Sequence, residues 1–183
     1  VKDPQLLLAG FAALRRGGTP AVLAVVGDGP LRAELQAWTR AHAVPDVHFL
    51  GFKNQSELPD LYAAADALVL PSARETFGVV VIEALHAGVP VIASDGVGCA
   101  EDLVLAEQTG LQFPRGDTAA LTRCLEALCT GETGRARRQQ LAAGARARAA
   151  SWTYAESTAG LVQALDAILG SPVGQASGCR GAL

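Results

Sequence analysis

The stretch ALVLPSARETFGVVVIEALHAGVPVIAS, residues 67–94, contains a predicted strand, loop, helix and second strand in that order. The runs ALVL and VPVIAS are short and continuously apolar, which is typical of strands that a parallel sheet buries on both faces. The segment GVVVIEALHA between them is predicted to be a helix. Because parallel strands are connected by right-handed crossovers, this stretch predicts one strand–helix–strand unit of an α/β sheet.

The same alternation of strands and helices extends along the chain in both directions. Further apolar runs of strand length lie at residues 21–26, 47–50 and 110–113. Helices are predicted at residues 5–16, 31–42, 56–65, 100–104 and 117–129, and the first of them follows Asp3-Pro4, a pair suited to a helix start. This order predicts an α/β fold, a doubly wound parallel sheet of Rossmann-like type.

The 183 residues are enough for one domain with a full core and an appended helical piece. A doubly wound domain normally starts with a strand, whereas this sequence starts with a helix, so we expect that the first strand is missing. Two C-terminal helices are predicted, over residues 135–149 and up to Leu169. We assign residues 1–169 to the domain and expect residues 170–183, which have the composition of a tail, to be disordered.

The composition argues against several classes of protein. The net charge is -3 and the pI is about 5.6, so there is no large basic surface for nucleic acid. The arginines between residues 135 and 148 are interpreted as a solvated helix face. The four cysteines form no CxxC pair, which predicts neither a zinc site nor a disulfide scaffold. Since the chain has no apolar run of about 18 residues and no signal-peptide pattern, we expect a cytoplasmic protein.

Glu75 and Glu83 stand in an otherwise apolar part of the quoted stretch, where an ionised carboxylate without partners is costly to bury. Ligands of open parallel sheets bind beyond the carboxyl ends of the strands. The loops expected there are residues 27–30, 51–53, 72–78 and 94–98. The helix that starts near Phe77-Gly78 would point its free amides at a phosphate. The two carboxylates would then accept hydrogen bonds from sugar and ribose hydroxyls at the two ends of a diphosphate.

Each of these features has an ordinary structural explanation when it is taken alone. The sequence GDGP, residues 27–30, is common in strand-to-helix turns, and Arg32 stands where the dinucleotide fingerprint needs its third glycine. Glu83 could form a salt bridge at a helix edge. Only the combination of glycine-containing loops, a helix start and two carboxylates indicates a binding site.

The sequence resembles the carboxyl-terminal domain of GT-B-fold glycosyltransferases of family four, the retaining enzymes that use nucleotide-sugar donors. The resemblance runs from about residue 2 to residue 128. Its most specific part is the E-x7-E motif of Glu75 and Glu83, followed by Gly88-Val89-Pro90. The segments that carry it are VVGDGPLRAEL (25–35), VHFLGF (47–52), LPDLYAAADALVLPS (58–72), ETFGVVVIEALHAGVPVIASD (75–95) and TGLQFPRGD (109–117).

The resemblance implies roles for two catalytic residues and eight donor-binding residues. Glu75 would lie beside the donor sugar and help to stabilise the oxocarbenium charge, and Lys2 would neutralise the diphosphate of the leaving group. The donor-binding positions would be Gly27 beside the nucleotide, Gly51, Phe52 and Lys53 along the base, the amides of Phe77, Gly78 and Val79 on the sugar and diphosphate, and Glu83 on the ribose. No metal or other cofactor is expected, because the sequence has no Asp-x-Asp motif and no histidine cluster.

The resemblance also implies partners outside this sequence. We expect the amino-terminal domain of the family, which binds the acceptor, and an arginine that precedes the lysine to be missing. The intact enzyme would be a hexosyltransferase of glycan or glycolipid biosynthesis, and the donor-binding half alone would be inactive. Its acceptor would be a glycan, a lipid or a small molecule, and any peripheral contact with the cytoplasmic face of a membrane would be made by the missing half. One departure is that residues 95–101 read DGVGCAE where the family often has G-G-x-x-E.

Two other functions stay open from the sequence. A sugar-nucleotide epimerase of similar architecture would bind its nucleotide in the same way, because fold alone does not specify chemistry. A non-catalytic nucleotide-binding module is the second alternative.

Overall fold

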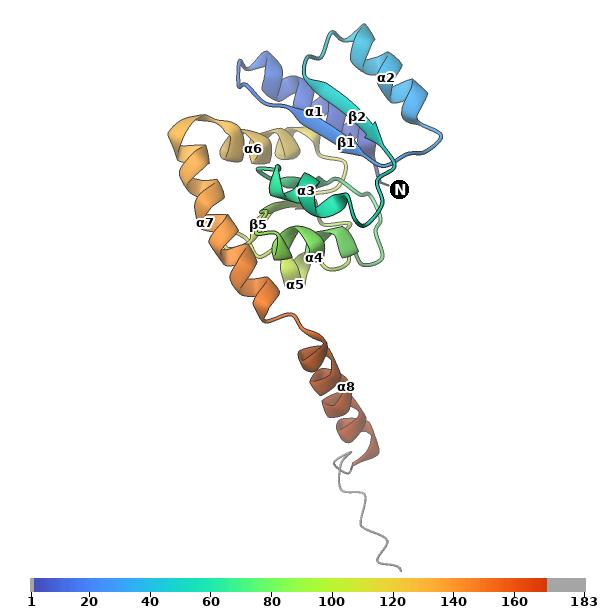
Figure 1. Ribbon diagram of the computed structural model, residues 1–183, viewed down its shortest axis with the longest axis vertical. Helices are drawn as coiled ribbons and strands as arrows, with labels where there is room; N and C mark the ends of the chain where they lie inside the picture. The colour runs from blue at the N-terminus through green and yellow to red at the C-terminus, as the bar shows by residue number, and fades with distance from the viewer. Residues whose placement is uncertain (1, 171–183) are drawn as a thin grey trace, which may run out of the picture.

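The structure is a computed structural model that describes residues 2–170 (Figure 1). Residues 171–183, nearly all of the predicted tail, lie outside the described residues. The strands are β1 (Leu23–Val26), β2 (Val47–Gly51), β3 (Leu68–Leu70), β4 (Val91–Ser94) and β5 (Gly110–Phe113). The helices are α1 (Pro4–Arg16), α2 (Arg32–Ala41), α3 (Leu58–Ala63), α4 (Val79–His86), α5 (Ala100–Leu103), α6 (Thr118–Cys129), α7 (Gly131–Ala150) and α8 (Tyr154–Leu169). The predicted order of elements is confirmed.

All the strand pairs are parallel, as predicted. Strand β1 pairs with β2, and β4 pairs with both β3 and β5. Within residues 2–170, no ladder joins β1 to β3, so the strands form a two-stranded and a three-stranded sheet. The predicted single sheet is therefore divided in the described part of the chain. The strand expected before α1 would belong to residues outside the sequence and stays a prediction.

The core lies on both faces of the three-stranded sheet. All four residues of β4 are buried, and alternate residues point to opposite faces. Val91 and Ala93 join the cluster that α4, α5 and α7 cover, whereas Ile92 joins the cluster that α1 and α6 cover. Helices on both faces explain why Val91, Ile92 and Ala93 of β4 are all apolar, instead of alternating with polar residues.

Short polar signals start two of the core helices. The Asp3 carboxylate accepts a hydrogen bond from the amide of Leu6 at 3.3 Å, and Pro4 is the first residue of α1. The Asp117 carboxylate caps α6 by accepting from the amide of Ala120 at 2.8 Å. Both caps satisfy amides that a helix leaves without an internal partner, so the helix starts expected from the sequence are explained.

Arginines of α7 attach this helix to the rest of the domain. Arg138 forms an ion pair with Asp66 at 3.1 Å, and Arg148 donates to the carbonyl of Asp102 at 2.9 Å. The Arg148 guanidinium also lies 5.1 Å from the ring centre of Trp152, a cation–π contact. Part of the arginine cluster, which the sequence predicts to be a solvated helix face, therefore has a structural role.

Helix α8 extends away from the other elements (Figure 1). None of its residues is buried. In residues 2–170, no helix has the length and apolarity to cross a membrane.

Leu121→Ala should lower the free energy of unfolding by about 2–5 kcal/mol, because it leaves a cavity in a fully packed site. Leu121 is fully buried on α6 and packs against Gly10 of α1. Urea unfolding followed by circular dichroism measures the change. The matched control is Leu161→Ala on α8, where the side chain is 61% exposed and a change below about 0.5 kcal/mol is expected. Equal effects of the two substitutions would contradict this account of the core.

Candidate functional site

The loop between β3 and α4, residues 71–78, is called the Glu75 loop below. It is bonded at several points to the loop between β4 and α5, residues 95–99. The Glu75 amide donates to the Gly96 carbonyl at 2.8 Å, and the Gly98 amide donates to the Glu75 carbonyl at 2.9 Å. A third bond runs from the Cys99 amide to the Phe77 carbonyl at 3.0 Å. The backbone around Glu75 is therefore held at the carboxyl ends of β3 and β4.

Two glycines make this contact sterically feasible. A Cβ atom on Gly96 would lie 2.4 Å from the Ser72 carbonyl oxygen, and one on Gly98 would lie 2.1 Å from the Thr76 carbonyl oxygen. Both distances are too short for any side chain. The glycines of residues 94–98, which we expected to mark a ligand loop, thus also support the neighbouring loop.

Gly78 is the N-cap residue of helix α4 and has φ 97°, in the left-handed region that favours glycine. No side-chain hydrogen bond from the described residues caps this helix start, so its first two amides, those of Val79 and Val80, have no side-chain acceptor among residues 2–170. The flanking side chains are accessible, with Phe77 42% and Val79 60% exposed. Cys99 donates its thiol to the Gly78 carbonyl at 3.7 Å, and burial raises the pKa of this thiol to about 11, so it is protonated at neutral pH.

The two carboxylates of the E-x7-E motif have no cationic partner in the described residues. The Glu75 side chain forms no hydrogen bond or ion pair with any residue between 2 and 170, although it is close enough to Cys99 to act on its thiol. Glu83 lies on α4 and accepts one hydrogen bond, from the Tyr62 hydroxyl to its Oε2 atom, at 2.8 Å. Both carboxylates thus retain free acceptor positions.

The loops after β1 and β2 form a second bonded group. The Gly27 amide donates to the Gly51 carbonyl at 2.8 Å, which joins the two loops directly. Arg32 pairs with Asp28 at 3.0 Å and donates to the Phe49 carbonyl at 3.4 Å. Arg32, which stands where a dinucleotide fingerprint has glycine, therefore connects the loop after β1 to strand β2.

Lys53 is held within its own loop. Its ammonium group donates to the Glu57 carboxylate at 2.8 Å, and the Asn54 amide donates to the same carboxylate at 3.1 Å. The lysine bond and the amide bond lower the pKa of Glu57. Phe52, beside Lys53, is exposed. This loop leads directly into α3, which carries Tyr62.

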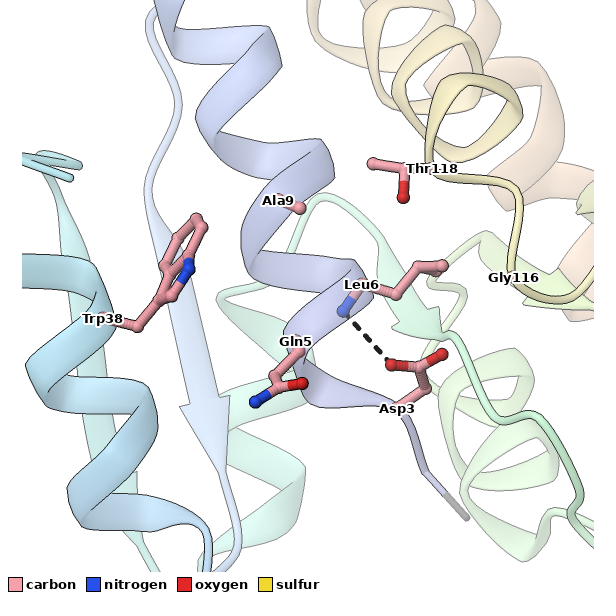
Figure 2. A pocket seen from close by; sticks show the side chains of 7 residues that line it. All are labelled: Asp3, Gln5, Leu6, Ala9, Trp38, Gly116 and Thr118. Atoms are coloured by element: carbon pink, nitrogen blue, oxygen red, sulfur yellow. Dashed lines mark hydrogen bonds between the residues drawn. The ribbon is translucent and has the colours of Figure 1, made fainter.

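Lys2 is exposed immediately before α1. The next residue, Asp3, lines a cavity of about 420 Å³ that Gly116 also lines (Figure 2). The neighbour of Gly116, Arg115, pairs with Asp95 at 3.2 Å and donates to the Ala73 carbonyl at 3.4 Å. The loop after β5, which lines this cavity together with Asp3, is thus bonded to the Glu75 loop. The remaining lining residues of this cavity are Gln5, Leu6, Ala9, Trp38 and Thr118, and none of the ten predicted site residues lines it.

The structure places nine of the ten predicted site residues in two groups at the carboxyl ends of the strands, and the tenth, Lys2, lies before α1. One group contains Gly27, Gly51, Phe52 and Lys53, and the other contains Glu75, Phe77, Gly78, Val79 and Glu83. In the described residues, no hydrogen bond or ion pair joins the predicted residues of one group to those of the other. The segment from Lys53 to Tyr62 connects the two groups, because Lys53 belongs to the first group and the Tyr62 hydroxyl donates to Glu83 of the second.

Sequence reasoning missed two residues that organise the site, Tyr62 and Arg115. Tyr62 lies 21 positions before Glu83, so no local pattern indicates their bond. Arg115 reaches 42 positions back to Ala73. Each of the two residues stands in a segment next to a predicted loop, which is the signal that the sequence offers. A contact between two separate crossovers can be recognised only when the fold is known.

The chain is similar to known glycosyltransferases. The family model described as "Glycosyl transferases group 1" matches residues 1–148. The 2-deoxystreptamine N-acetyl-D-glucosaminyltransferase of Streptomyces fradiae is 43% identical over 108 residues, 58% of this chain and 25% of that protein. The D-inositol 3-phosphate glycosyltransferase of Salinispora arenicola is 34% identical over 174 residues, 89% of this chain and 38% of that protein.

A solved structure gives the same result. Anabaena HepE in complex with UDP-glucose has a TM-score of 0.74 at 25% identity, over 91% of this chain and 45% of the HepE chain. The chain thus spans between a quarter and two fifths of the curated relatives named above. These similarities confirm the predicted family and the predicted Rossmann-like half of a GT-B fold.

Gly98→Ala should lower the free energy of unfolding by about 1–3 kcal/mol, the usual cost of inserting a methyl group into a tightly packed position. The new Cβ would collide with the Thr76 carbonyl and displace the backbone that carries Glu75. Thermal unfolding of the variant and the parent chain measures the loss. Gly29→Ala is the control, since no atom lies within 4 Å of the position of its Cβ. An unchanged midpoint for Gly98→Ala would contradict the proposed contact.

Proposed function

The chain belongs to the glycosyl transferases group 1 family, and we propose that it is the donor-binding part of a retaining enzyme. This enzyme transfers a sugar from a nucleotide-diphosphate sugar to an acceptor hydroxyl. The observation that carries the proposal is the pair of carboxylates, Glu75 and Glu83, without cationic partners on either side of the uncapped start of α4. Family membership also favours a transferase over the epimerase and the non-catalytic module.

The donor diphosphate binds at the start of α4 in this proposal. The amides of Phe77, Gly78 and Val79 lie at an uncapped helix end, where the partial positive charge of the helix favours an anion. Gly78 is buried and takes a backbone conformation that glycine adopts without strain. These amides need no rearrangement when phosphate arrives, which lowers the cost of binding.

The two carboxylates bind the two sugar rings of the donor. Glu83 accepts hydrogen bonds from the ribose hydroxyls, and Glu75 accepts from the transferred sugar and stabilises the positive charge that develops as the glycosidic bond breaks. The Glu75 loop is held by backbone bonds to residues 95–99. Glu75 is thus positioned before the donor binds, as electrostatic stabilisation of a transition state requires.

Lys2 neutralises the leaving nucleotide diphosphate in this proposal. Its exposed ammonium group has no bonding partner among residues 2–170, and Asp3 beside it lines the same cavity as Gly116 of the loop after β5. Gly27 and the loop of Gly51, Phe52 and Lys53 border the nucleotide. Because fixed charges and amides stabilise the diphosphate, the reaction proceeds without a metal ion.

The acceptor is bound outside this chain in the proposed enzyme. The relatives are longer, and this chain covers 38% of the D-inositol 3-phosphate glycosyltransferase. HepE has been solved with UDP-glucose, which supports a nucleoside diphosphate hexose as donor and hence a hexosyltransferase. We place the enzyme in the cytoplasm, in glycan or glycolipid biosynthesis, with any contact to a membrane surface made by its acceptor-binding part. The donor-binding part alone is then inactive.

Calorimetric titration of the chain with UDP, GDP and ADP tests the nucleotide site. One of the three should bind, and Glu83→Ala should weaken that nucleotide roughly 10- to 150-fold, the range expected for hydrogen bonds to a charged group. Glu126→Ala, an exposed carboxylate on α6, is the matched control and should leave the affinity unchanged. If no nucleotide binds, or if both variants bind like the parent, the donor-binding proposal is wrong.

Chelation tests the proposal that no metal takes part. With EDTA present, the initial rate of sugar transfer by the enzyme with its acceptor-binding part should stay within about twofold, since amides and Lys2 supply the positive charge. The measurement is a radiometric transfer assay, with magnesium or manganese added back as the control. A rate that falls with EDTA and recovers with either ion would overturn this part of the proposal.

A further inference from the structure

Tyr62 forms the one side-chain hydrogen bond of Glu83 among residues 2–170. The hydroxyl donates to Oε2 at 2.8 Å, and the donor and acceptor lie on different helices, α3 and α4. The Tyr62 ring packs against the cluster of buried residues under α4. The bond therefore joins a tyrosine whose ring is held by packing to a carboxylate of the proposed donor site.

The chemistry of this bond differs from that of the arginine-paired carboxylates of the domain. Asp46, Asp66 and Asp95 each pair with an arginine, at 2.7, 3.1 and 3.2 Å. Glu83 is paired with a neutral hydroxyl instead. A neutral donor leaves the negative charge of the carboxylate in place, and burial together with the bond to Glu83 raises the pKa of Tyr62, so the hydroxyl stays protonated.

Resting on the function proposed above, we propose that Tyr62 is a positioning residue that orients Glu83 for the ribose of the donor nucleotide. A carboxylate has two oxygens and about four acceptor positions. With Oε2 engaged by Tyr62, rotation of the carboxylate is restricted and Oε1 is left to accept from the two neighbouring hydroxyls of ribose. The bond thus removes conformational freedom before the ligand arrives.

The place of Tyr62 in the chain extends this role to the base. Helix α3 follows the loop in which Lys53 and Asn54 hold Glu57. This loop would border the base in the proposed complex. The same short segment therefore carries the base-side loop at its start and the hydroxyl that orients Glu83 near its end, which links recognition of the base to recognition of the ribose.

The test compares a ribonucleotide with its 2′,3′-dideoxy form in calorimetric titrations of the chain. The nucleotide is UDP, or GDP or ADP if one of these binds more tightly. Tyr62→Phe keeps the packed ring and removes only the hydroxyl. It should weaken the ribonucleotide about tenfold, by analogy with other hydrogen bonds to charged groups. The dideoxy nucleotide should change less than about twofold, because it has no ribose hydroxyls for an oriented carboxylate to bind.

The chain offers a matched control, since Tyr154 is its only other tyrosine and is 95% exposed. Tyr154→Phe should leave both affinities unchanged. An equal loss of both nucleotides in Tyr62→Phe would show a merely structural role and would overturn the inference, as would no loss of either.

Glu83→Gln separates failure of this inference from failure of the proposed function. If this variant reduces binding of the ribonucleotide selectively while Tyr62→Phe does not, the ribose role of Glu83 stands and only the role of Tyr62 is wrong. If Glu83→Gln leaves the preference for the ribonucleotide unchanged, or if the parent chain binds no nucleotide, the proposed function and the inference fall together.

Discussion

The backbone contact between the Glu75 loop and residues 95–99 is the constraint on which the candidate site depends. Three amide–carbonyl bonds join the two loops, and Gly96 and Gly98 permit the approach. The contact sets where Glu75 lies, how Gly78 turns and where the first amides of α4 point. Main-chain bonds of this kind restrict the loop without using any side chain. The Glu75 side chain is therefore available for a ligand.

Charge is distributed unevenly between the scaffold and the site. In the scaffold, arginines neutralise carboxylates, as in the pairs of Arg15 with Asp46 and Arg138 with Asp66. At the site, Glu75 has no partner in the described chain and Glu83 has a neutral one. A donor with hydroxyls at both ends and a diphosphate in the middle matches this pattern, because its anionic part meets helix amides and its hydroxyls meet carboxylates.

The sequence predicted the elements well because their signals are local. Apolar runs of strand length, helical spacing and the Asp3-Pro4 helix start act within a few residues, and the structure confirms the order that they indicate. Long-range features were not predictable. The division of the sheet, the bond of Tyr62 to Glu83 and the reach of Arg115 to Ala73 each join different crossovers. The E-x7-E motif indicated which carboxylates matter, whereas their surroundings required coordinates.

Helix α8 has a thermodynamic consequence that follows from its lack of buried residues. Its Thr153–Glu156 capping box satisfies its first amides, so the helix is supported by local bonds and not by a core. A helix of 16 residues that is not stabilised by packing is near the limit of stability in water. Its amide hydrogens would exchange with solvent through local fraying, whereas those of β4 would need global unfolding. Residues 2–170 would therefore unfold as two units of very different stability, the domain core and α8.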